Sequence, residues 1–230
     1  MPNSPDRRPG VKRETPPGGD AERLERYCAL VAAAPISLTA VRDPVELRRL
    51  LVEDALTALP LLHRLGPELV VDVGSGSGSP GIPLAIATGL TVVLLESRSP
   101  KAAFLRGAVE QLGVACPVIH RTAEEHGREA GRDRYDLALA RALAPPPVAL
   151  ELCLPLVRPG GHVLLWVANV DAAETGEVAR QMAAEIGPAT ATGRARALLL
   201  VRKLGPTPER FPRRPGVARR RPLRAVRSSA

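Results

Sequence analysis

Aromatic residues are scarce in this sequence: phenylalanine, tyrosine and tryptophan together make up 2% of its 230 residues. A core must therefore be filled by the aliphatic side chains that supply most of the 45% hydrophobic content. So few rings also argue against a protein that stacks single-stranded bases on aromatic platforms. The length suits one globular domain with short appendages and excludes a small scaffold held together by disulfides.

Cysteine and long apolar runs are also rare. Cys28, Cys116 and Cys153 are widely spaced and contain no Cys-x-x-Cys pair, so we expect buried thiols in a reducing compartment. The four histidines lack metal-ligand spacing, and we expect no metal site. No apolar run approaches the ~18 residues of a membrane helix, and the first ten residues lack the apolar stretch of a signal peptide. These absences predict a cytoplasmic protein without a membrane partner.

The net charge of +8 is concentrated near the C-terminus. From Arg202 to Ala230 there are ten basic residues and a single acid, Glu209, which leaves 22 basic and 23 acidic residues in the rest of the chain. A cationic end of this kind is typical of proteins that bind a phosphate backbone, although a solvated tail gives the same pattern. The candidate RNA contacts are Arg213, Arg214, Arg219, Arg220 and Arg221.

Four segments differ in composition and pattern. Residues 1–19 are rich in proline, glycine and charge, and we expect them to be disordered. Residues 20–67 predict a small N-terminal helical cap, because apolar residues recur at helical spacing and Asp43 followed by Pro44 is a typical helix start. Residues 68–204 predict the main domain, and residues 205–230 predict a basic C-terminal tail.

Within the main domain, short β-branched runs alternate with helical stretches. Residues 99–112 predict a helix closed by Gly113, and residues 171–187 predict a further helix. Such alternation implies an α/β domain with a mostly parallel sheet and helices on both faces. The predicted strands are residues 69–73, 91–96, 117–120, 136–140, 162–167 and 197–203.

The most informative segment is the glycine loop after the first predicted strand. Gly74, Gly76 and Gly78 alternate with serines and precede a helix. Glycines here let a ligand approach the backbone, and free N–H groups at a helix start favour an anionic group. Ligands of open α/β sheets bind at this edge, so the loop indicates a cofactor site rather than a purely structural turn.

Two classes of ligand compete for this loop. Residues 76–81 match the dinucleotide pattern G-x-G-x-x-G, which alone is weak evidence for a nicotinamide-dependent oxidoreductase. Asp72 argues against a pyrophosphate and favours a ligand with an ammonium group. S-adenosyl-L-methionine carries an amino acid, a cationic sulfonium, a ribose and an adenine, and fits better. Glu96 lies where an acid accepts ribose hydroxyls, and Glu124 lies where an adenine edge would pass.

The chain resembles the bacterial ribosomal RNA small subunit methyltransferase G family, also called the glucose-inhibited division protein B family. The resemblance spans about residues 36–223. Its specificity lies in the combination and order of the segments rather than in any one of them. The matching segments are residues 36–41, 72–83, 122–124, 135–145, 152–156, 159–161, 211–216 and 221–223.

The resemblance implies a class I methyltransferase fold, a Rossmann-like, mostly parallel seven-stranded sheet. It also implies methyl transfer from S-adenosyl-L-methionine to N7 of a guanine in the 530 loop of 16S rRNA. The partner would be 16S rRNA or the small ribosomal subunit, and we expect a monomer. Carried over by motif, the cofactor contacts are Gly74, Ser79, Ala123, Glu124 and Arg141.

Arg141 and Asp54 are the candidate catalytic residues. Arg141 follows the fourth predicted strand, where its guanidinium would orient the cofactor or hold a phosphate, or would form a structural ion pair. Asp54 would accept a hydrogen bond from the guanine amino group, or would be an exposed helix residue without a role. Methylation of N7 needs no general base because that nitrogen carries no proton, so catalysis can rest on positioning.

Four positions depart from the usual pattern of the family: Leu51, Ala55, Ser79 and Val167. They leave two alternatives open. One is a diverged member that methylates another RNA or a small molecule. The other is a protein that binds rRNA or the ribosome without turnover.

Overall fold

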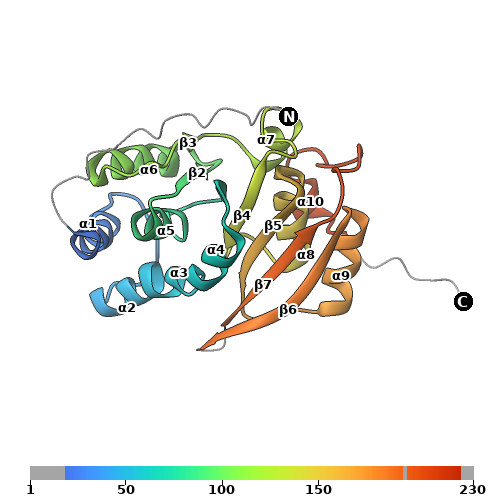
Figure 1. Ribbon diagram of the computed structural model, residues 1–230. Coiled ribbons are helices and arrows are strands. Elements are labelled where there is room, and N and C mark those ends of the chain that lie inside the picture. Colours follow the sequence, from blue (N-terminus) through green and yellow to red (C-terminus); the bar gives the residue numbers. More distant parts are fainter. Residues whose placement is uncertain (1–18, 194–195, 224–230) are drawn as a thin grey trace, which may run out of the picture.

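The computed structural model describes residues 19–193 and 196–223; residues 1–18, where disorder is expected, and the last seven residues lie outside this description. A seven-stranded sheet with the order β3-β2-β1-β4-β5-β7-β6 forms the centre of the molecule (Figure 1). The first five strands are parallel, and β7 runs antiparallel to both of its neighbours. The strands are β1 (Leu69–Val73), β2 (Thr91–Leu95), β3 (Val118–Ile119), β4 (Tyr135–Arg141), β5 (Val157–Val167), β6 (Ala184–Gly193) and β7 (Arg196–Lys203).

Helices cover both faces of the sheet, as predicted (Figure 1). Each face has its own aliphatic core. The first face carries α1 (Asp20–Ala32), α2 (Pro44–Arg48), the π-helical turn η1 (Arg49–Glu53), α3 (Asp54–Leu56), α4 (Leu59–Leu65), α5 (Gly81–Thr88) and α6 (Ser99–Leu112). The second carries α7 (Ala123–Arg128), α8 (Pro146–Cys153), the 3-10 turn η2 (Leu154–Leu156), α9 (Ala172–Gln181) and α10 (Val217–Arg220).

The N-terminal cap, residues 20–67, folds largely as the apolar spacing predicts. Asp43 caps α2 by accepting a hydrogen bond from the Glu46 N–H at 2.9 Å. Leu51 and Ala55, two of the positions that depart from the family pattern, are buried in the packing of this cap. The helix that begins at Pro44 is interrupted near Ala58, because Pro60 has no N–H to continue the preceding turn.

The predicted helix over residues 171–187 is wrong in its second half. Helix α9 ends at Gln181, and Ala183 takes a positive φ of 54° that ends the helical geometry. The chain then enters β6, a strand that the sequence pattern did not indicate. Because β6 is an edge strand with mostly exposed residues, it lacks the apolar alternation that marks a half-buried strand.

Residues 205–223, predicted as part of a basic tail, pack against the domain. Phe211 and Ala218 are buried in the second core, and Thr207 is buried beside them. The three cysteines are buried and free, which confirms the expected thiols. Within the described residues, no helix is long and apolar enough to cross a membrane, and no cluster of histidine, cysteine or carboxylate side chains could hold a metal ion.

Asp72, near the end of β1, is the most deeply buried acid close to the glycine loop. Its side chain accepts a hydrogen bond from the Gly81 N–H at 3.1 Å and is 1% exposed. Burial raises the pKa of Asp72 to about 7, against the opposing effects of the Gly81 hydrogen bond and the nearby Arg141 charge. In the folded chain this carboxyl group is therefore mostly protonated below about pH 7 and mostly ionised above it.

A raised carboxyl pKa makes a contribution to stability that is complete below the ordinary carboxyl pKa of 3.8 and is lost as the pH rises from there to about 7. We expect Asp72→Asn, which keeps an oxygen acceptor for Gly81, to abolish this contribution. Between pH 5 and pH 8 the wild type should lose about 2 kcal/mol of unfolding free energy relative to the variant, measured by urea denaturation. An offset between the two chains that stays constant with pH would contradict this expectation.

Candidate functional site

The glycine loop between β1 and α5 depends on backbone conformations that favour glycine. Gly74, Gly76 and Gly78 have φ values of 70°, 56° and 101°, which other residues rarely adopt. The Gly74 N–H donates to the Leu95 carbonyl at 2.7 Å, so the loop is attached to the end of β2. The loop is thus a fixed feature of the sheet edge.

Two acidic side chains fix this loop by accepting hydrogen bonds from its backbone and from the start of α5. Asp72 lies beneath it and accepts the Gly81 N–H at the start of α5. Glu96 follows β2 and accepts the N–H groups of Gly76 at 2.9 Å and Arg98 at 2.8 Å. Asp72 is thus sealed under the loop, away from the position in which we expected it to meet a ligand ammonium group.

A cavity of about 190 Å³ opens beside the loop, at the carboxyl ends of β1 and β2. The order of the sheet reverses between β1 and β4, and ligands of open α/β sheets bind at such switch points. We call this hollow the switch-point cavity. Its lining comprises Val73, Gly74, Leu95, Ser97, Arg121, Thr122, Ala123, Glu124, Leu143, Leu152, Gly216 and Arg219.

Three of the predicted cofactor contacts, Gly74, Ala123 and Glu124, line this cavity. Thr122 and Glu125 form a capping box that begins α7 and fixes the two residues between them. Glu124 is 7% exposed, and its Oε1 accepts the N–H of Gly216 at 2.8 Å. Glu124, which we predicted to lie beside the adenine, is therefore hydrogen-bonded to the C-terminal part of the chain.

Gly78 and Ser79 have different surroundings from the cavity residues. A Cβ at Gly78 would lie 2.5 Å from the Ile82 Cδ1 atom, so this glycine permits the close packing of α5. The Ser79 Oγ is buried and donates to the Leu51 carbonyl at 2.6 Å. These residues attach the loop to helix α5 and to the N-terminal cap.

Asp54 lies at the centre of a polar cluster between the cap and the sheet. Its Oδ2 accepts the Nη1 of Arg141 at 3.2 Å and the Nη1 of Arg196 at 2.7 Å. Its backbone carbonyl accepts the Trp166 Nε1 at 2.9 Å and the Thr57 hydroxyl at 2.6 Å. Arg141 also donates to the Leu50 carbonyl. The structural ion pair weighed for Arg141 thus exists, with Asp54 as the acid.

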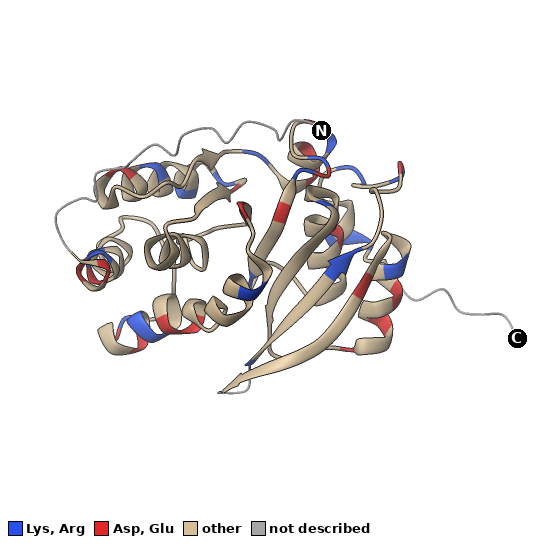
Figure 2. Ribbon diagram, viewed as in Figure 1, with Lys and Arg blue, Asp and Glu red and all other residues tan. Residues whose placement is uncertain are grey.

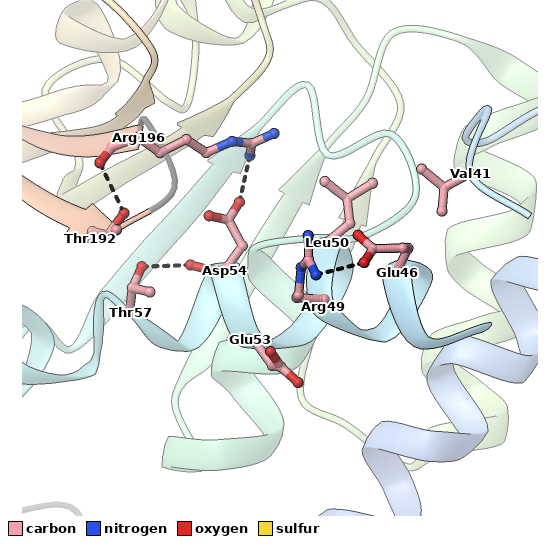
Figure 3. A pocket seen from close by; sticks show the side chains of 10 residues that line it. Val41, Glu46, Arg49, Leu50, Glu53, Asp54, Thr57, Thr192 and Arg196 are labelled. Atoms are coloured by element: carbon pink, nitrogen blue, oxygen red, sulfur yellow. Dashed lines mark hydrogen bonds and ion pairs between the residues drawn. The ribbon is translucent and has the colours of Figure 1, made fainter. Parts of the chain in front are cut away.

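Two further hollows meet at this cluster. The cap cavity, about 450 Å³, lies between the N-terminal cap and the adjacent ends of β6 and β7, and Figure 3 shows Arg196 reaching across it to Asp54. The β4 cavity, about 320 Å³, contains Arg141, Ala142 and Ala144 from the end of β4, together with Trp166, Ala168 and Arg196. Because Leu143 lines the switch-point cavity, the two hollows lie on opposite sides of one short segment.

The C-terminal arginines fall into two groups. Arg213 is only partly exposed and forms a two-pronged ion pair with the buried carboxylate of Glu151, at 2.5 Å for each contact. The exposed arginines among the described residues 213–221 form no ion pair, and basic residues gather along this segment and the adjoining loops (Figure 2). The exposed set is Arg214, Arg219, Arg220 and Arg221.

Sequence reasoning missed several residues of these sites. Leu143 and Leu152 form apolar walls, and Gly216 comes from a segment far along the chain. Arg196 lies 142 positions from its partner Asp54. A local motif could not have indicated that pair, because only the return of β7 beside β5 brings the two side chains together.

Comparisons with known proteins agree with this geometry. A family profile described as rRNA small subunit methyltransferase G matches residues 20–194. A protein named ribosomal RNA small subunit methyltransferase G from Rubrobacter xylanophilus is 37% identical over 217 residues, covering 87% of this chain and 83% of its own length. The protein of the same name from Thermotoga maritima is also 37% identical, covering 88% of this chain and 87% of its own length.

Solved structures support the fold. An O-methyltransferase from Bacillus cereus, crystallised with S-adenosylhomocysteine (SAH), has a TM-score of 0.55 and 19% identity, covering 79% of this chain and 91% of its own. At that identity the likeness establishes the class I methyltransferase fold alone. Taken with the profile match and the relatives, it confirms the resemblance that the motifs indicated: this chain belongs to the rRNA small subunit methyltransferase G family.

Proposed function

We propose that this chain is an S-adenosyl-L-methionine-dependent methyltransferase that methylates N7 of a guanine in the 530 loop of 16S rRNA. The observation that carries the proposal is the switch-point cavity beside the glycine loop in a member of this family. The substrate would be rRNA, free or within the small ribosomal subunit. The exposed basic residues would contact its phosphates.

The residues of the switch-point cavity fit S-adenosyl-L-methionine. Val73, Leu95 and Leu152 offer an apolar surface for an adenine, while Thr122 and Glu124 offer polar groups at its rim. Gly74 leaves room beside the loop, since a Cβ there would come within 2.6 Å of the Leu143 Cδ1 atom. This combination of an apolar slot with a few polar groups is typical of nucleotide-like ligands.

Glu96 can support the cofactor while it holds the loop. A carboxylate has about four lone-pair sites, and two backbone N–H groups occupy two of them. The remaining capacity suits ribose hydroxyl groups, the role we predicted for this residue. Asp72 would act indirectly, because its buried side chain fixes the start of α5 beneath the loop.

The bound cofactor supplies an activated methyl group on a sulfonium. The chain then has to hold a guanine with its N7 facing that methyl. N7 has an exposed lone pair and no proton, so no side chain is needed as a base. Correct placement of two reacting groups is worth up to about 7–11 kcal/mol in favourable cases. The function of the site is therefore positioning.

We infer that the β4 cavity receives the guanine. It lies across the short segment of Leu143 from the cofactor, and Arg141 and Arg196 reach it. Asp54 carries the negative charge of the cluster, suited to the N1–H and amino donors of guanine, whereas the arginines suit O6. The polar cluster would then orient the base as well as connect the cap to the sheet.

Methyl transfer can be tested directly with small ribosomal subunits that lack the modification. Incubation with the chain and S-adenosyl-L-methionine should produce N7-methylguanosine in the 530 loop, detected by mass mapping of rRNA digests. Gly74→Asp should give no product and no SAH binding by calorimetry, because it adds bulk and charge at the cavity.

The matched control for that variant is Gly89→Asp. Gly89 has the same kind of backbone conformation, φ +72°, but has open space around it. We expect Gly89→Asp to bind SAH and to form product, since its strain lies at the far end of α5. Product in another nucleotide would redirect the substrate assignment, and unchanged SAH affinity in Gly74→Asp would contradict the cofactor site.

Asp54→Asn should lower kcat/KM for rRNA at least about tenfold, the effect of one lost charge-assisted contact in the transition state. Its SAH affinity should stay unchanged, because Asp54 lies outside the switch-point cavity. Steady-state kinetics and calorimetry measure the two quantities. Glu53→Gln is the control, since this neighbouring acid points away from Asp54 in Figure 3 and should keep its kcat/KM. Equal losses in both variants would remove Asp54 from guanine recognition.

Replacing Arg214, Arg220 and Arg221 together with alanine should weaken RNA binding and reduce its dependence on salt. Each phosphate contact contributes ~0.7–0.9 to the slope of log affinity against log salt concentration. The slope should therefore fall by about 2 if all three arginines contact phosphates. Filter binding over a salt series measures it. A slope that matches the wild type would show that this surface does not contact RNA.

A further inference from the structure

The segment formed by residues 207–220, which we call the C-terminal strap, is bonded to the domain at points from Thr207 to Gly216. At its start, the Thr207 hydroxyl donates to Asp133 at 2.5 Å and accepts a hydrogen bond from the Lys203 Nζ at 2.7 Å. Lys203 is fully buried and also contacts Asp133 at 3.0 Å. Burying a lysine is costly unless its ammonium group is hydrogen-bonded or paired with an acid. Because Thr207 is one of these partners, the start of the strap is fixed in place.

The middle of the strap is held by two arginines of the domain. Arg132 donates to the carbonyls of Thr207 and Phe211, each at 2.7 Å. Arg128 donates to the Pro212 carbonyl at 3.1 Å. Phe211 itself is 2% exposed and lies in the second core. These contacts fix the path of the backbone on its way to the cofactor site.

The end of the strap is held directly against that site. The pair of Arg213 with Glu151 joins the strap to α8, and Glu151 is 1% exposed. Three residues later, the Gly216 N–H donates to the carboxylate of Glu124. Gly216 and Arg219 then line the switch-point cavity, which Gly74 of the glycine loop also lines. The strap therefore forms part of the wall of this cavity.

We propose that the strap, through Gly216 and Arg219, forms part of the binding site for the adenosyl portion of the cofactor, and that Arg213 and Glu151 are positioning residues for it. The inference rests on the proposed function, because it takes S-adenosyl-L-methionine as the occupant of the switch-point cavity. Arg213, which we predicted as an RNA contact from its charge, instead points into the domain and pairs with Glu151. Its neighbour Arg214 is exposed to solvent and would contact RNA.

The first test needs no variant. Hydrogen–deuterium exchange of the wild-type chain is compared with and without SAH. The inference expects slower exchange at the amides of residues 213–219 as well as at residues 74–78 of the glycine loop. Slower exchange at the loop alone would overturn the strap inference and leave the proposed cofactor site intact. The absence of any SAH binding would overturn the cofactor site, and the inference with it.

The second test compares two adjacent arginines. Arg213→Gln should raise the Kd for SAH by about tenfold, the loss of roughly one buried contact, and should leave the salt dependence of RNA binding, measured with saturating SAH, unchanged. Arg214→Gln should keep the wild-type Kd for SAH and reduce the RNA salt slope by ~0.7–0.9. The reverse pattern, or equal effects of the two changes, would overturn the inference.

A conservative variant separates positioning from simple loss of folding. Glu151→Gln keeps the shape and one acceptor for Arg213 but loses the charge, so its Kd for SAH should lie between those of the wild type and Arg213→Gln. Thermal unfolding of each variant is followed in parallel. A Kd for SAH that stays at the wild-type value in folded Arg213→Gln and Glu151→Gln would overturn the positioning role.

Discussion

Two buried acidic side chains, Asp72 and Glu96, fix the glycine loop on which the sites of this molecule depend. Asp72 lies near the end of β1 and Glu96 follows β2, and each accepts backbone N–H groups of the loop or of the helix that follows it. Burying an acidic side chain, charged or protonated, is costly unless it forms such hydrogen bonds. The N–H groups of the loop and of the start of α5 supply these hydrogen bonds. The same bonds fix the backbone of the loop beside the switch-point cavity.

The polar cluster around Asp54 connects three parts of the chain that are distant in sequence. Asp54 comes from the N-terminal cap, Arg141 from the end of β4 and Arg196 from β7. One carboxylate shared by two guanidinium groups leaves a net positive charge at the edge of the β4 cavity. Such a charge suits both an RNA backbone and the O6 atom of guanine, the groups that the proposed substrate would present to this cavity.

The basic C-terminal segment shows why charge composition predicts a partner better than it predicts individual contacts. Arg213 and Arg214 are adjacent and chemically identical, yet Glu151 lies beside only the first of them. The cationic composition of this segment was evident from the residues. Which arginines point inward depended on the position of α8, whose buried acid no local pattern connects with residue 213.

The sequence by itself determined the mostly parallel sheet, the helices on both faces and the glycine loop, because these follow from local periodicity and from backbone conformations that favour glycine. It also contained the motifs that indicated the family. Only the tertiary structure decided that Asp72 is sealed under the loop, that β6 is a strand and that Gly216 lines the switch-point cavity. Each of these depends on contacts between residues far apart in the chain, where local patterns carry no information.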